Sequence, residues 1–70
     1  MNKLILKFLH DSKQDMKEVV ISCIGGIHVS GVVAEIEEYG DEPSIILIDG
    51  DDVHVVDPTK ICCVTISNRS

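Results

Sequence analysis

The chain has 70 residues, so we expect one small domain over residues 1–70. A chain this short buries only about 60% of its unfolded surface, so the domain should be only marginally stable alone. Hydrophobic residues make up 44% of it, there is one Tyr, one Phe and no Trp, and the formal net charge is −6. No apolar run approaches the roughly 18 residues of a membrane span and no signal peptide is recognisable, so a cytoplasmic protein without a membrane segment is expected.

The first segment, residues 2–15, has the apolar spacing of an amphipathic helix. Its apolar stripe consists of Leu4, Ile5, Phe8 and Leu9. Lys3 and Lys7 fall on a different face of this helix. We interpret that face as a solvated one on a helix that covers one end of a small β structure; contact of the lysines with phosphate is the alternative.

Five strands are predicted after this helix, because Val and Ile dominate the rest of the chain and β-branched residues favour strands. Their approximate bounds are 17–24, 27–39, 44–48, 53–56 and 61–66. Gly25-Gly26 predicts a tight hairpin turn, since two glycines accept the positive φ that such turns require. Gly31 lies inside the second strand, where the missing side chain indicates a bulge or a sharp bend.

A helix followed by five short strands, with the second strand bent at a glycine, resembles the Sm-like (LSm/Hfq-like) family. The residues that carry the resemblance are Gly26, Val29 and Gly31 in the spacing G-x-x-h-x-G, then Val32-Val33 and Ile36-Glu37, and Phe8-Leu9, which is similar to the lead-in helix of Hfq. The resemblance implies a mainly β fold: a small Sm-like (SH3-type) barrel of five bent antiparallel strands with an N-terminal α-helix. It also implies a homo-oligomeric ring, in which the fourth and fifth strands pair edge to edge between subunits.

The resemblance implies RNA as a ligand, and it points to residues at two loops and on the helix. In this family a basic residue in the turn before the last strand contacts RNA, whereas here the turn reads Asp57-Pro58-Thr59. The candidate RNA-binding residues that follow from the resemblance are Tyr39 after the second strand, Thr59 and Lys60 in the turn, and Lys3 and Lys7 on the helix.

The charge pattern keeps two functions open. No Lys or Arg lies between Lys17 and Lys60, and the same window is rich in Asp and Glu. Because affinity for nucleic acid depends largely on cations that neutralise phosphates, the body of the domain is poorly suited to RNA. One hypothesis is a non-enzymatic oligomeric binding module with altered or weakened RNA specificity. The alternative is an acidic oligomeric protein-interaction module that has lost RNA binding and meets a basic protein partner.

Metal binding and catalysis have weaker signals. Carboxylates in the turn Asp49-Gly50-Asp51-Asp52 are suitable ligands for a hard cation, but a turn rich in Asp and Gly is ordinary hairpin chemistry. Cys23, Cys62 and Cys63 are expected to be small buried thiols, and an odd number of cysteines fits a reducing compartment. No nucleophile motif is present, so we expect no enzyme. We also expect no cofactor and no metal site.

Overall fold

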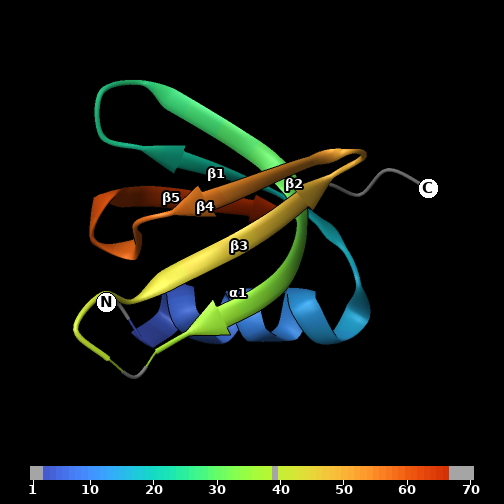
Figure 1. Cartoon of the computed structure of the whole chain (residues 1–70), viewed down its shortest axis with the longest axis horizontal. Helices are drawn as coiled ribbons and strands as arrows, with labels where there is room; N and C mark the ends of the chain where they lie inside the picture. The colour runs from blue at the N-terminus through green and yellow to red at the C-terminus, as the bar shows by residue number, and fades with distance from the viewer. Residues whose placement is uncertain (1–2, 39, 67–70) are drawn as a thin grey trace.

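The computed structural model describes residues 3–38 and 40–66, which form an N-terminal helix and a bent antiparallel sheet (Figure 1). In chain order the elements are α1 (Lys3–Asp15), β1 (Glu18–Cys23), β2 (Ile27–Glu37), β3 (Ser44–Asp49), β4 (Asp52–Val56), the short 3-10 helix η1 (Pro58–Lys60) and β5 (Ile61–Ile66). The mainly β architecture expected from the sequence is confirmed. Tyr39 lies outside the described residues.

Helix α1 lies along one side of the sheet and packs against β2 and β5. Leu9 and Ser12 face the sheet and are buried, and the Ser12 hydroxyl is satisfied because it donates to the Phe8 carbonyl oxygen at 2.8 Å. Among the residues that the structure describes, no helix has the length and hydropathy needed to cross a membrane.

The C-terminus of α1 is closed by two backbone hydrogen bonds around Met16. The Lys17 N–H donates to the Ser12 carbonyl at 3.0 Å and the Met16 N–H donates to the Lys13 carbonyl at 3.2 Å. This is the pattern of a Schellman motif, whose central residue is left-handed and usually glycine. Here Met16 takes that position, with a φ of +55°.

The strand order in the sheet is β4-β3-β2-β1-β5, so β4 and β5 are its two outer strands. Each of them has one edge without a strand partner among the described residues. Figure 1 shows β4 crossing the front of the molecule while β5 lies behind it. The sheet therefore curves into an open barrel and exposes two unpaired edges.

Strand β2 carries the bend, but the irregularity lies three residues beyond the one that the sequence pattern indicated. The register between β2 and β3 shifts between Val33 and Glu35, not at Gly31. Gly31 instead allows the backbones of β2 and β3 to approach closely, because a Cβ atom at this residue would lie 2.7 Å from the Ile48 carbonyl oxygen.

One face of the sheet and the inner side of α1 form the hydrophobic core. Val19 and Ile21 alternate along β1, and Ile45 and Leu47 alternate along β3, as expected for strands with one buried face. The fully or nearly fully buried core residues are Leu9, Val19, Ile21, Val33, Ile45, Leu47 and Val56. All are aliphatic, which agrees with the scarcity of aromatic residues in the sequence.

Candidate functional site

The turn between β4 and β5 is held by the Asp57 side chain, which caps η1. Its Oδ1 atom accepts hydrogen bonds from the Thr59 backbone N–H at 2.9 Å and from the Thr59 hydroxyl at 2.7 Å. The Thr59 hydroxyl and then the Thr59 N–H lower the pKa of Asp57 below its ordinary value of 3.8; desolvation opposes them, and the nearby Lys60 ammonium makes the smallest contribution, also lowering. This turn therefore presents a carboxylate that stays ionised at neutral pH.

Lys60 ties the same turn to β1 through its backbone. Its N–H donates to the Asp57 carbonyl at 3.1 Å, and its carbonyl accepts from the Ile24 N–H at 2.9 Å. Its side chain is exposed. Both backbone polar groups of Lys60 are thus hydrogen-bonded, while its exposed ammonium can reach a ligand.

A hollow of about 620 Å³ lies between this turn and the loop before β3. Asp41, Glu42 and Asp57 line it, together with Thr59 and the end of β4 at Val55 and Val56. Among the residues that the structure describes, no Lys or Arg side chain lines it. Three carboxylates around one hollow attract cations and repel phosphate, so this site suits a cationic group better than RNA.

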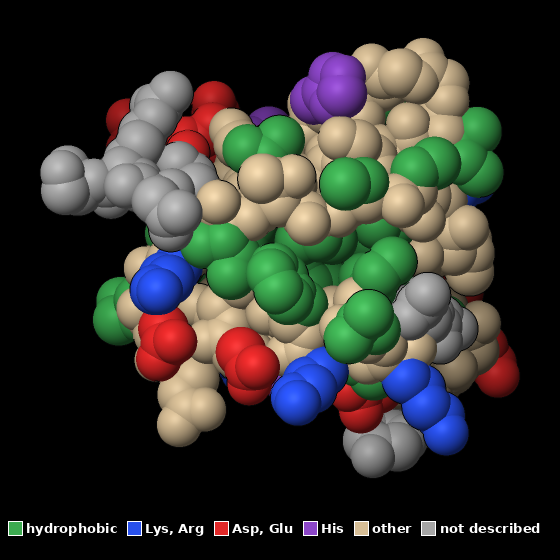
Figure 2. All heavy atoms as spheres, turned by 180° about the vertical axis from the view of Figure 1, so that it is seen from behind, with side chains coloured by type: hydrophobic (Ala, Val, Ile, Leu, Met, Phe, Trp, Pro, Cys, Tyr) green, Lys and Arg blue, Asp and Glu red, His purple; other side chains and the backbone are tan. Residues whose placement is uncertain are grey.

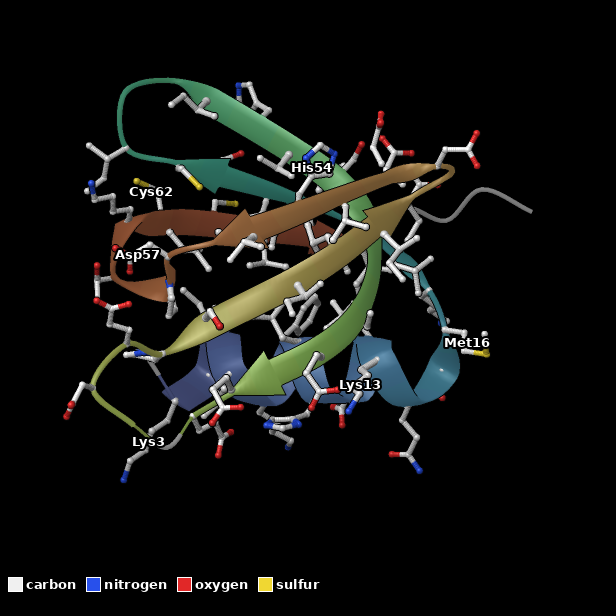
Figure 3. All side chains as sticks on the ribbon, in the orientation of Figure 1. Lys3, Lys13, Met16, His54, Asp57 and Cys62 are labelled. Atoms are coloured by element: carbon white, nitrogen blue, oxygen red, sulfur yellow. The ribbon has the colours of Figure 1, made fainter. Side chains whose placement is uncertain are left out.

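The candidate RNA-binding residues are not gathered in one place. Thr59 lines the hollow, Lys60 follows it in the turn, and Lys3 and Lys7 are exposed on α1. Figure 3 shows the Lys3 side chain pointing away from the sheet, while Asp57 lies on the turn above it. The two helix lysines are therefore not among the described residues that line the acidic hollow.

Comparison with known proteins finds similar solved structures but no relative by sequence. No protein-family profile matches the sequence, and no curated protein matches it. A crystal structure of the pleiotropic translational regulator Hfq matches with a TM-score of 0.70 and 25% identity, over 96% of this chain and 97% of that one. The chain has the Sm-like fold. The resemblance stated from the sequence is thereby confirmed for the fold.

The Sm-like sheet exposes an apolar groove that the sequence analysis missed. Leu4, Ile5 and Phe8 of α1 and Val64 of β5 line this groove, which has a volume of about 210 Å³. From behind, Figure 2 shows it as part of a hydrophobic band across the middle of the molecule, above a row of charged side chains. Leu4 is 72% exposed. The groove therefore lies between α1 and β5, which is an outer strand of the sheet.

A polar contact that no local pattern indicates joins α1 to the end of β2. The His10 Nε2 atom contacts the Glu38 carboxylate across 28 positions of the chain, and both side chains are partly exposed. Another histidine, His28, contacts the Ser22 hydroxyl across the β1–β2 hairpin. Both histidines therefore have ordinary polar partners.

The cysteines depart from expectation. Cys62 and Cys63 are exposed and Cys23 is half-buried, so the prediction of buried thiols is wrong for the first two. The reason is that they lie on an outer strand, where the register between β1 and β5 also shifts. Within residues 3–38 and 40–66, no group of three or more His, Cys, Asp or Glu side chains is placed to hold a metal ion.

Proposed function

We propose that this chain is the subunit of a homo-oligomeric ring that acts as a non-enzymatic binding module in the cytoplasm. The observation that carries this is the pair of unpaired edges at the two ends of one sheet, on β4 and β5. Antiparallel pairing of β4 in one copy with β5 in the next satisfies both edges, and closing the ring leaves none free. The odd number of cysteines fits a reducing compartment.

Exposed apolar side chains beside β5 support the same assembly. Leu4 and Phe8 of α1, which line a groove with Val64 of β5, are 72% and 40% exposed. A chain of this size gains stability when such surface is buried by a second copy, because its own core is small.

RNA is the first ligand class of this proposal, bound weakly and mainly through charge. Lys3, Lys7 and Lys60 supply the cations, and Thr59 and Tyr39 stay candidates for polar and stacking contacts. The acidic hollow opposes binding at the turn, so we expect the helix lysines to dominate. A salt-sensitive and weak interaction follows, because few phosphates are neutralised.

A titration of poly-U and poly-A RNA at low salt tests this ligand. We expect weak binding that disappears at high salt and falls severalfold in a Lys3→Gln, Lys7→Gln double variant. Lys17→Gln is the matched control, since this exposed lysine lies beyond the end of α1. Absence of binding at low salt rejects RNA as the ligand.

The acidic hollow favours a second candidate function, an oligomeric module for protein interaction that meets a basic partner. Asp41, Glu42 and Asp57 give it the charge for such a partner. Capture of partners from lysate with and without nuclease separates the two functions. Partners that remain after nuclease treatment support this candidate, whereas partners that vanish were bridged by RNA.

A further inference from the structure

The outer face of β2, β3 and β4, opposite the core, carries a continuous set of aliphatic side chains. Across the strands, Val32 pairs with Ile48, which pairs with Val53, and Ile46 pairs with Val55. Side chains directly opposite each other on one face are in contact range. We call Val32, Ile46, Ile48, Val53 and Val55 the outer strip.

The outer strip is accessible to a partner. Val53 and Val55 are mostly exposed, Ile48 is 44% exposed, and Val32 and Ile46 are half-buried. An exposed run of aliphatic residues on three neighbouring strands is more than the isolated apolar residues common on protein surfaces. Helix α1 packs on the other face of the sheet, so a helix on the outer face would add a second helical layer.

A groove at one end of the outer strip extends it towards α1. It has a volume of about 520 Å³, and Met16 and Lys13 line one side of it while Val32, Ala34 and Ile48 line the other. Figure 3 shows Met16 at the turn that follows α1, and its side chain is 77% exposed. Met16 keeps a left-handed backbone that favours glycine, and its flexible thioether suits contact with varied apolar surfaces.

The charges around the outer strip indicate which kind of partner can bind to it. Glu35 pairs with Ile46 and Glu18 pairs with Val32, so carboxylates flank the aliphatic rows. No Lys or Arg occurs from Glu18 to Thr59, and among the described residues that line the groove Lys13 is the one cation, at the end next to α1. Two copies stacked face to face would bring these carboxylates together, which is unfavourable. A partner that carries Lys or Arg beside its apolar residues is attracted instead.

We propose that the outer strip and its groove bind a basic amphipathic helix of a partner protein. The apolar side of that helix packs on the outer strip and beside Met16, and its Lys or Arg side chains lie against Glu18 and Glu35. A sheet face of three strands has the width of one helix, about 10 Å. This goes beyond the proposed ring, because the outer strip lies within one chain and leaves the backbone edge of β4 available.

Synthetic helical peptides test the proposal on the full chain. The probe has Leu at positions i, i+3, i+4 and i+7 and Lys elsewhere, and its binding is followed by fluorescence anisotropy. A scrambled peptide of the same composition and a peptide with Glu in place of Lys are the controls. We expect both controls to bind at least about tenfold more weakly than the probe.

Variants locate the site of binding. Val53→Thr with Val55→Thr keeps β-branched residues in β4 and is expected to weaken the probe about tenfold. Ile24→Thr with Ile27→Thr changes two exposed aliphatic residues at the β1–β2 hairpin and is expected to leave binding unchanged. The native mass of each variant is measured alongside, and we expect it to stay at the wild-type value.

Three results would overturn the proposal. The first is no binding of the probe, or equal binding of either control peptide. The second is an equal loss of binding in the hairpin variant. The third is a lower native mass of the Val53→Thr, Val55→Thr protein, which would show that another copy of the chain covers the outer strip. Failure of the ring itself is seen separately, as a monomeric native mass of the wild-type protein.

Discussion

At the residue scale, Met16 stores backbone strain at the end of α1. A non-glycine residue in the left-handed region is disfavoured by roughly 1 kcal/mol. We therefore expect Met16→Gly to raise the free energy of unfolding by about 1 kcal/mol and the melting temperature by several degrees. Met16→Ala is the matched control, because it shortens the side chain but keeps the strained φ. Equal stability of the two variants would contradict the assignment of strain to this residue.

Gly31 shows the opposite case, a position where glycine is required. A Cβ atom at this residue would lie 2.7 Å from the Ile48 carbonyl oxygen and 3.3 Å from the Leu47 Cβ atom, and φ is +153°. Since the nearest obstacle is backbone, β2 and β3 would have to separate. Gly31→Ala should lower the free energy of unfolding by more than about 2 kcal/mol in chemical denaturation. Gly25→Asn, at a hairpin position with open space, should change it by less than about 1 kcal/mol.

Asp57 makes the stability of the fold depend on pH through the turn before β5. Its folded-state pKa lies below the ordinary 3.8, first because of the Thr59 hydroxyl. The carboxylate therefore stabilises the fold above pH 3.8, and this contribution is lost as the pH falls through the lower folded-state pKa. In an NMR titration, Thr59→Val should raise the pKa of Asp57 towards its ordinary value. Thr65→Val, which removes a hydroxyl from β5, should leave that pKa unchanged.

At the scale of elements, the unpaired edge of β5 is the part of the proposed ring most open to test. Cys62 is exposed on this strand. A carboxylate on an edge strand opposes pairing with another strand, so Cys62→Asp should reduce the native mass to that of a monomer while the circular dichroism spectrum is kept. Ile27→Asp places the same charge at an exposed position of the hairpin and should not change the mass. An unchanged mass in Cys62→Asp would argue against assembly through β5.

The elements could be predicted from the sequence where the signal is local. Runs of Val and Ile, glycine turns and the helical stripe give the helix, the five strands and their order along the chain. The shift of register between Val33 and Glu35 could not be predicted, because a bulge depends on the partner strand and not on β2 alone. The short helix η1 was also missed, although Asp57 followed by Pro58 is a capping sequence that indicates one.

The candidate site was harder to predict than the fold, because its parts come from distant segments. The acidic hollow joins Asp41 and Glu42 to Asp57, and nothing in the local sequence brings them together. The groove beside β5 did leave a signal. The apolar stripe of the helix contains Leu4, Phe8 and Leu9, and of these only Leu9 is fully buried. Leu4 and Phe8 stay exposed and line the groove.

At the scale of the whole molecule, net charge acts on assembly. Each chain carries −6, so copies repel one another when they associate. Because salt screens repulsion between exposed charges, raising the ionic strength should shift the population towards the oligomer. Sedimentation of the wild-type protein at low and high salt measures this. Dissociation at high salt would mean that ion pairs between subunits outweigh the general repulsion.

The two unpaired edges of this small sheet are different from each other, and this has a consequence for mixed populations. A subunit with a damaged β5 still offers an intact β4, so it can join a growing assembly at one side and block the next addition. A minority of Cys62→Asp chains should therefore stop wild-type chains from closing their rings. In a cell that makes both forms, such a variant would behave as a dominant inhibitor, whereas a variant that fails to fold would be recessive.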